Sequence, residues 1–284
     1  MRKKYTIPTW FAFGWLGLAV FLAIFGSFLP VDGYQVIHGD FIDSPPFTPG
    51  HWFGVDSNGY DIFSGIINGA RLSVFIALVS VGLGGAIGSA LGISAAYYRG
   101  RYDSFVNTTF NVVLSVPNLV LALALVAVLA TNVDINEAVP TWRRLATLII
   151  SLTVVIIPIL GRIARAATLA WSGREFVVAA RSMGMRDRDI ISRHIVPNVL
   201  PALIAVGFLA VGVVIIAEAS LSLLGVGIPD GASWGGMLAR GRNDLEYNPH
   251  ALYIPIIALA FTVISTNHVG DGLRGKLDGR EGRL

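Results

Sequence analysis

The chain lacks cysteine and has few charged residues: Asp, Glu, Lys and Arg make up only 14% of its 284 residues. Without cysteine, disulfide bonds, thiolate chemistry and cysteine-ligated metals are excluded. Soluble domains carry about 25% charged residues. The low charge, with 54% hydrophobic residues and a mean hydropathy of +0.67, therefore indicates a membrane protein surrounded by lipid. The excess of positive charge follows membrane topology, and we expect no nucleic-acid partner.

Motifs that would make the chain a catalyst are also missing. It has no Gly-x4-Gly-Lys-Ser/Thr phosphate loop, and residues 272–276 lack both the spacing and the hydroxyl of one. It has no His-Glu-x-x-His or other tight metal cluster, and its five histidines are scattered, as interfacial or structural histidines are. We therefore expect no catalytic, cofactor or metal site, and no enzyme activity, in this chain.

Six apolar segments are long enough to cross a bilayer as helices, which takes about 20 residues. They cover residues 9–29, 72–98, 105–130, 145–161, 199–224 and 251–269. The first follows three basic residues, as a signal peptide would, but it has no convincing small-x-small cleavage site, so we interpret it as a retained span. The pattern predicts an all-α polytopic membrane protein with six transmembrane helices.

The distribution of Lys and Arg predicts the orientation of these spans. With the N-terminus inside, 16 of the 21 basic residues fall in inner segments, so both termini are predicted to be cytoplasmic. The predicted organisation is a cytoplasmic tail (1–8), a first span with its outer segment (9–71), a core of five spans (72–270) and a second cytoplasmic tail (271–284). The outer segments 31–71 and 225–250 carry glycine and aromatic residues typical of membrane interfaces.

Residues 170–197 form a charged, helix-forming insert on the predicted cytoplasmic side, where no span requires one. Residues 175–183 contain no Gly or Pro, and four of them repeat on one helical face: Phe176, Ala179, Ala180 and Met183. Gly184 is a predicted helix stop. Asp187 is a predicted N-cap of a second helix, which runs into the fifth span.

This insert is predicted to dock a soluble partner. Two adjacent alanines would allow a close approach, and charged side chains form a rim around them. A basic loop that only sets topology is the alternative, but the order of helix, glycine stop and second helix favours docking. The candidate docking residues are Glu175, Ala179, Ala180, Arg181, Gly184 and Asp187.

Polar residues inside the spans are candidates for a translocation path or for helix packing. Glu218 is the only acid well inside an apolar run, and an ionisable group at that depth is a functional hypothesis by default. The alternative is a structural hydrogen bond that holds the turn of Ser220 and Ser222. A second candidate set follows helical spacing along the third span, beside a possible kink at Pro117, and it either lines a path or bonds neighbouring helices: Asn107, Asn111, Ser115 and Asn118.

Glycines recur every fourth residue in the second span, at Gly84, Gly88 and Gly92. This spacing lets the backbone of another helix approach closely, so it favours packing, with a hinge as the alternative.

The insert resembles the cytoplasmic signature of the membrane-spanning subunits of ATP-binding-cassette importers. That signature reads Glu-Ala-Ala, three residues, Gly, nine residues, Ile-x-Leu-Pro, and here Ala179, Ala180, Gly184 and Pro197 stand at the matching places. Three positions depart from it, with Val178 in place of Glu, His194 in place of Ile and Val196 in place of Leu. Glu175, one turn earlier, is a partial substitute for the missing Glu.

Further segments are similar to the dipeptide, oligopeptide and nickel branch of that family, and to the second of its two permeases. They are residues 53–61, 69–71, 193–198, 218–227, 233–238 and 270–274. The resemblance implies the type I importer architecture, in which a cytoplasmic coupling helix contacts the ATPase. It also implies a sister permease, two cytoplasmic ATPases that bind ATP and Mg, and an extracytoplasmic solute-binding protein.

Peptides are the expected cargo, and nickel or a glycoside is the alternative within the branch. A self-sufficient secondary transporter is the alternative from another class, but it would need coupling groups at mid-membrane and related halves. An integral-membrane enzyme would need a convergent set of acids, bases or metal ligands, which the sequence does not offer.

Overall fold

The structure, a computed structural model, describes residues 7–33, 36–130, 140–228 and 233–281. Every regular element in these ranges is helical, beside a few isolated β-bridges, which confirms the all-α prediction. Five helical segments are long and apolar enough to span a membrane: Ile7–Phe28, Ile62–Tyr98, Thr141–Ser172, Asp187–Leu223 and Pro249–Gly275. Most of the predicted tail 1–8, and the last residues of the tail 271–284, lie outside the described residues.

The predicted third span is not one continuous helix. Helix α3 (Gly100–Ser115) and helix α4 (Asn118–Ala130) meet at an angle of 90°. Pro117 at the break has no N–H for a helical bond, and its ring disfavours a helical residue before it. Val116 is accordingly extended, with φ −87° and ψ 131°. The predicted kink is confirmed, and the single helix over 105–130 is wrong. The described residues hold five spans, or six where the bent pair is counted as one span.

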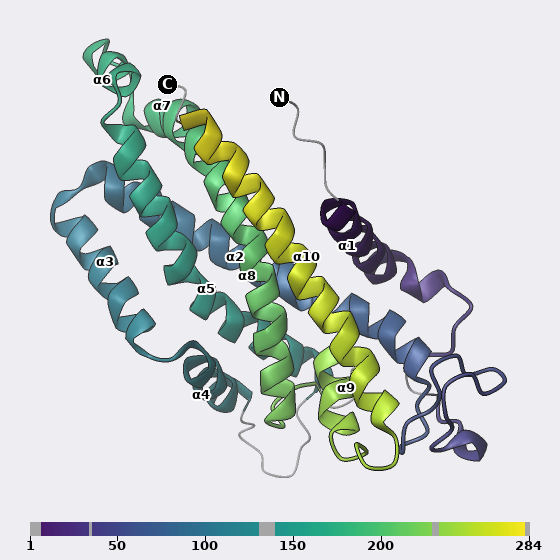
Figure 1. The fold of residues 1–284 in the computed structure, drawn as a ribbon. Coiled ribbons are helices and arrows are strands. Elements are labelled where there is room, and N and C mark those ends of the chain that lie inside the picture. Colours follow the sequence, from purple (N-terminus) through teal and green to yellow (C-terminus); the bar gives the residue numbers. More distant parts are fainter. Residues whose placement is uncertain (1–6, 34–35, 131–139, 229–232, 282–284) are drawn as a thin grey trace.

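The long helices form one bundle (Figure 1). Helix α2 (Ile62–Tyr98) packs along α5 (Thr141–Ser172), and α8 (Val196–Leu223) packs along α10 (Pro249–Glu281). Helix α1 (Ile7–Phe25) covers α2 and α10, where Trp15 Nε1 donates to Thr262 Oγ1 over 2.9 Å. Many large apolar side chains on the outside of the bundle are exposed, such as Phe13, Leu78 and Ile204, as expected for a surface in lipid.

Both ends of the described chain lie at the same end of the bundle. Thr9 Oγ1, near the start of α1, is 3.0 Å from His268 Nε2, in the second half of α10. Gly270 of α10 in turn lies against Ala205, in the first half of α8. The short helices α6 (Glu175–Ser182) and α7 (Asp187–Ile190) project at this end, and a π-helical turn, Ile191–Ile195, joins α7 to α8 (Figure 1).

Glycines bring the backbones of α2 and α5 into contact. A Cβ added to Gly88 would lie 2.2 Å from the carbonyl oxygen of Ile157, and one added to Gly92 would lie 2.1 Å from that of Gly161. A Cβ added to Gly84 would lie 2.7 Å from the side chain of Ile156 and 3.1 Å from the carbonyl oxygen of Thr153. Any side chain at these positions would overlap the facing helix, so the structure supports packing rather than a hinge as the role of the glycine repeat.

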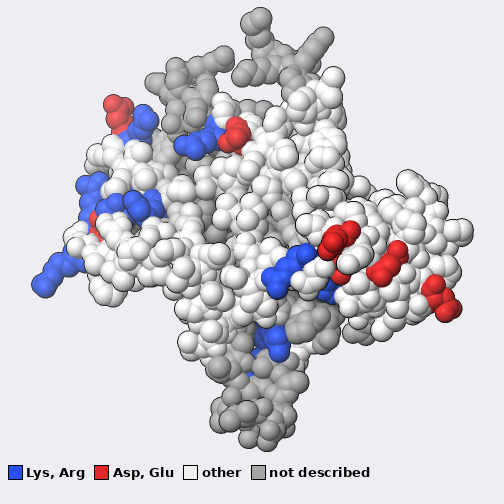
Figure 2. All heavy atoms as spheres, turned by 60° about the horizontal axis from the view of Figure 1, so that its bottom comes forward, with Lys and Arg blue, Asp and Glu red and all other residues white. Residues whose placement is uncertain are grey.

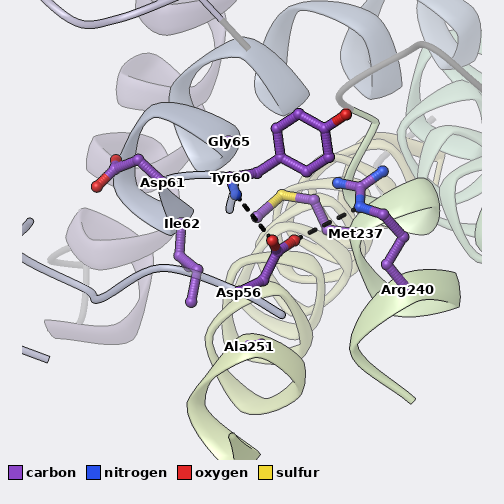
Figure 3. Close-up of a pocket in the computed structure, with 8 residues that line it drawn as sticks. All are labelled: Asp56, Tyr60, Asp61, Ile62, Gly65, Met237, Arg240 and Ala251. Atoms are coloured by element: carbon purple, nitrogen blue, oxygen red, sulfur yellow. Dashed lines mark hydrogen bonds and ion pairs between the residues drawn. The ribbon is translucent and has the colours of Figure 1, made fainter. Parts of the chain in front are cut away.

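At the opposite end of the bundle, residues 36–61 contact α9 (Trp234–Gly241) and the turn after it. Asp56 accepts hydrogen bonds from the backbone N–H groups of Asn58 and Tyr60 and lies 3.6 Å from Arg240 Nε (Figure 3). Burial raises the pKa of Asp56, although these three partners oppose the shift. Ser57 Oγ donates to Asp244 Oδ2 over 2.6 Å, so residues almost 190 positions apart are joined.

Charged side chains are sparse on this face of the molecule. In Figure 2, which turns this end forward, acidic residues gather at the right with basic residues beside them, and the remaining basic residues lie mostly at the left, together with a few further acids. The exposed acids at this end include Asp32, Asp40, Asp43 and Glu246.

We predict that Gly88→Ala destabilises the bundle and that Gly82→Ala does not. Overpacking of a tight contact costs about 1–3 kcal/mol, and here the added methyl group meets backbone that cannot rotate away. Gly82 lies on the same helix with nothing within 4 Å of its added Cβ. Thermal unfolding in detergent measures the difference, and equal midpoints for the two variants would contradict the backbone contact.

Candidate docking surface and buried polar cluster

Helix α6 ends as its glycine predicts. Gly184 has φ +79°, a backbone conformation that residues with a Cβ rarely adopt. The N–H of Met185 donates to the carbonyl of Ala180 over 3.1 Å, and that of Gly184 donates to Arg181 over 3.0 Å. These two bonds form the Schellman motif, which satisfies the last carbonyls of a helix.

One face of α6 packs on the bundle. Val177 and Ala180 are buried in an apolar cluster with residues of α2, α5, α7, the π-helical turn and α8: Ile93, Tyr97, Ala164, Ile190, Ile195 and Val199. The prediction that Ala180 shares an outward face with Ala179 is therefore wrong. Ala180 serves the chain's own packing, because its small side chain lets α6 lie close to the bundle.

The other face of α6 is exposed and largely apolar. The exposed fraction is 41% for Phe176, 55% for Val178 and 78% for Met183, and Ala179 is also exposed. Arg181, Arg186 and Arg188 are exposed nearby and supply positive charge. We call these seven residues the docking surface. Glu175 begins α6, and Gly184 is exposed directly after it.

Asp187 does not cap the second helix as predicted. The extended residue before α7 is Arg186, with φ −67° and ψ 142°, and Asp187 is the first helical residue. Its carboxylate instead accepts a hydrogen bond of 2.5 Å from the hydroxyl of Tyr97, in the last turn of α2. The guanidinium of Arg181 lies over the same tyrosine ring, 5.2 Å from its centroid, and a hydrogen bond with Tyr97 raises the pKa of Arg181.

The second helix of the insert is continuous with the fifth span, as predicted. It runs from α7 through the π-helical turn into α8, which extends to Leu223. The π turn lies directly before Pro197, which has no N–H to donate to a preceding carbonyl. The fourth span also extends beyond its predicted end at residue 161, because α5 continues to Ser172, close to the start of α6.

Glu218 lies at the centre of a buried polar cluster near the opposite end of the bundle. It is 1% exposed and accepts hydrogen bonds from Ser222 Oγ over 3.0 Å and from Ser73 Oγ over 3.4 Å. Ser73 also accepts a hydrogen bond of 3.1 Å from the backbone N–H of Trp234, at the start of α9. The cluster therefore ties together α2, α8 and α9.

This geometry places Glu218 inside the chain rather than on a surface that substrate or a sister subunit would touch. The alternative prediction, a structural hydrogen bond between Glu218 and the serines that follow it, holds for Ser222. It does not hold for Ser220, whose hydroxyl donates to the carbonyl of Ile216 in its own helix. Sequence reasoning missed Ser73 because it lies 145 residues away. It also missed Gly235, whose added Cβ would lie 3.0 Å from Glu218 Oε2.

The predicted polar stripe is divided by the bend at Pro117. Asn107, Asn111 and Ser115 lie on α3, whereas Asn118 begins α4. Asn107 is half-buried and the other three are exposed, since Val106 and Phe110 form the inward face of α3. The stripe therefore faces away from the chain's own core, and its role in a path or in packing stays a prediction.

The described residues contain no group of three or more His, Cys, Asp or Glu side chains that could hold a metal ion.

Comparison with known proteins places the chain among transport components. Residues 88–283 match the family described as "Binding-protein-dependent transport system inner membrane component". The glutathione transport system permease protein GsiD of Shigella dysenteriae serotype 1 (strain Sd197) is 36% identical over 263 residues, covering 92% of this chain and 82% of that protein. The same protein of Pectobacterium atrosepticum is 34% identical, covering 92% and 83%.

Solved structures share the fold. The inward-facing MetNI methionine ABC transporter matches with a TM-score of 0.61 and 20% sequence identity, covering 75% of this chain and 97% of that one. A second crystal form of the same transporter matches with a TM-score of 0.59.

We predict that Glu218→Ala destabilises the protein by about 1–3 kcal/mol, because it leaves buried hydroxyl donors without an acceptor. Glu218→Gln keeps the shape and one acceptor oxygen, so this variant should lose less stability than Glu218→Ala. Ser220→Ala is the control, since its hydroxyl bonds only within its own helix turn. Unfolding midpoints in detergent test the order, and a Glu218→Ala protein as stable as the control would contradict the structural role.

Proposed function

Since the chain belongs to the family of binding-protein-dependent transport system inner membrane components, the multi-pass permeases of ATP-binding-cassette importers, we propose that it carries short peptides across the cell membrane. Its fold is that of a type I importer permease. The predicted resemblance is confirmed, because its relatives are permeases of the peptide branch.

The proposed cargo rests on those relatives, whose names specify glutathione, itself a tripeptide. Glutathione is therefore the first compound to test, followed by dipeptides and longer peptides. The relatives lend no support to nickel, a glycoside or a self-sufficient secondary transporter.

An importer permease of this fold works with ATPase and permease partners. We propose one sister permease, two ATPase subunits and an extracytoplasmic solute-binding protein that delivers the cargo. The ATPases would bind ATP and Mg, so this chain would need no cofactor and would catalyse no reaction itself. The docking surface is the observation that supports separate ATPase subunits. It offers exposed apolar side chains on a projecting helix that ends in a rigid glycine cap.

We further propose that the end of the bundle carrying α6 is cytoplasmic, together with both chain termini. The excess of Lys and Arg in the inner segments supports this orientation. The contact between Thr9 and His268 supports it as well, because it keeps both ends of the chain on one side.

In the proposed mechanism, ATP binding brings the two ATPases together, and each moves the docking helix of its permease. We call residues 175–195, from α6 through α7 and the π-helical turn, the docking segment. Its second half is helical without interruption into α8, so a displacement of α7 reaches a membrane span directly. The two permeases then turn between inward-facing and outward-facing states, and cargo passes along the interface between them. The exposed polar stripe on α3 is a candidate lining of that interface.

Ala179→Arg should abolish recovery of the ATPases with this chain while leaving the chain folded. Ala179 is exposed at the docking surface, so a long charged side chain would block a close partner without entering the chain's own core. Tyr247→Arg, at the opposite end and 81% exposed in the wild type, is the matched control and should retain the ATPases. Purification from native membranes in mild detergent, followed by mass spectrometry, measures the recovery. ATPases retained by Ala179→Arg would contradict this docking surface.

Glutathione, presented with the cognate binding protein, should stimulate ATP hydrolysis by the reconstituted wild-type complex. The measurement is the hydrolysis rate in proteoliposomes with and without the peptide, with nickel as the comparison. Stimulation by nickel and not by any peptide would overturn the proposed cargo while leaving the family assignment intact.

A further inference from the structure

The docking segment is tied to the end of α2 by a directional side-chain contact. The hydroxyl of Tyr97 donates to Asp187 Oδ1 over 2.5 Å, across a sequence separation of 90 residues. Tyr97 is 6% exposed, so its ring is held in the bundle while its hydroxyl reaches the segment that carries the docking surface.

Arg181 makes this contact a three-residue arrangement. Its guanidinium lies 5.2 Å from the centroid of the Tyr97 ring, so one tyrosine contacts both the last turn of α6 and the first residue of α7. The two short helices flank Gly184, and Tyr97 touches residues on both sides of this turn. A single side chain of α2 thus contacts both helices.

The other contacts of the docking segment with the bundle are mainly apolar. Val177, Ala180, Ile190 and Ile195 are buried against α2, α5 and α8. Apolar burial is non-directional, so it holds the segment on the bundle without specifying one register along it. A short hydrogen bond to a carboxylate is directional and about twice as strong as a neutral one. In the described part of the chain, the Tyr97 contacts therefore supply the directional link between the docking segment and α2.

The helix that carries Tyr97, α2, is in contact with α5 and α3, among other helices. It is in backbone contact with α5 through Gly88 and Gly92, so a shift of its end also shifts α5. Directly after Tyr98 the chain reverses, with φ +57° at Arg99 and +66° at Gly100, and enters α3. Arg165 of α5 holds α3 through a bidentate pair with Asp103, at 2.6 and 2.7 Å. Tyr97 thus lies where the docking segment meets a connected set of three helices.

We propose that Tyr97 is a positioning residue that couples the docking segment to α2 through Asp187, so that a displacement of the docking surface also moves α2, α5 and α3. This inference rests on the proposed function, because it assumes that an ATPase moves the docking surface. It also gives Asp187 a role other than the predicted contact with the ATPase, since its carboxylate faces Tyr97.

The test compares variants that remove or keep the hydrogen bond. Tyr97→Phe removes the hydroxyl and keeps the ring, and Asp187→Ala removes the acceptor. Asp187→Asn keeps an oxygen that accepts the same bond and loses only the charge. Tyr98→Phe is the matched control, because this neighbouring tyrosine is 57% exposed and has a ring contact, at 5.2 Å, with Tyr97.

The readout is the distance between two spin labels, one on the docking segment and one beside the end of α2. Ser192→Cys, on the docking segment but outside the docking surface, and Arg101→Cys provide exposed sites, and the chain has no cysteine of its own. The whole importer complex is measured by pulsed electron paramagnetic resonance, without nucleotide and with ATP and vanadate. A complex whose permease lacks both introduced cysteines gives the background from the partners.

In the wild type, the distance distribution should keep its width when ATP and vanadate are added, because the two labelled elements move together. Tyr97→Phe and Asp187→Ala should each broaden it at least twofold in that state, and the double variant should broaden it no further. Asp187→Asn and Tyr98→Phe should behave as the wild type, with unfolding midpoints unchanged throughout.

Wild-type widths in Tyr97→Phe and Asp187→Ala, with the ATPases still bound, would overturn the positioning role and leave the proposed function standing. Equal broadening by Asp187→Asn and Asp187→Ala would rule out the hydrogen bond as the coupling. A wild-type complex that retains no ATPase would instead overturn the proposed function.

Discussion

The backbone contact between α2 and α5 is the constraint on which the other contacts depend. In a bilayer, apolar side chains gain little by leaving lipid for another helix, so close packing must come from shape. Glycines at positions 84, 88 and 92 remove the side chains that would keep the helices apart, and Gly161 does so from the facing helix. The pair then forms a rigid centre against which α1, α3, α4 and α8 pack.

Polar groups fix the two ends of this bundle in different ways. At one end Glu218, wholly buried, binds serines that bring together α2, α8 and α9, and Ser57 donates a hydrogen bond to Asp244 in the turn after α9. At the other end the polar contacts lie nearer the surface, in the pair of Asp103 with Arg165 and in the contact of Tyr97 with Asp187. Buried polar groups need partners in a medium without water, so each polar contact also specifies which helices are neighbours.

The docking surface shows how a departure from the family signature is accommodated. Val178 occupies the place of the signature Glu and is 55% exposed, so the substitution changes the surface and not the chain's core. The neighbouring Ala180, which matches the signature, is buried against the bundle. The two alanines of the signature therefore differ in role here, since one faces outward and the other holds α6 in place.

The sequence by itself determined the membrane class, the glycine stop at Gly184 and the family, because hydropathy, helix-ending residues and ordered motifs are local properties of the chain. Only the tertiary structure decided the partners of Glu218 and Asp187, the burial of Ala180 and the 90° break at Pro117. The helical period of α6 does not show whether Ala179 or its neighbour Ala180 faces the bundle. Hydrogen bonds such as those from Ser73 and Tyr97 join residues 145 and 90 positions apart, and no local pattern encodes which distant side chain will fill a position.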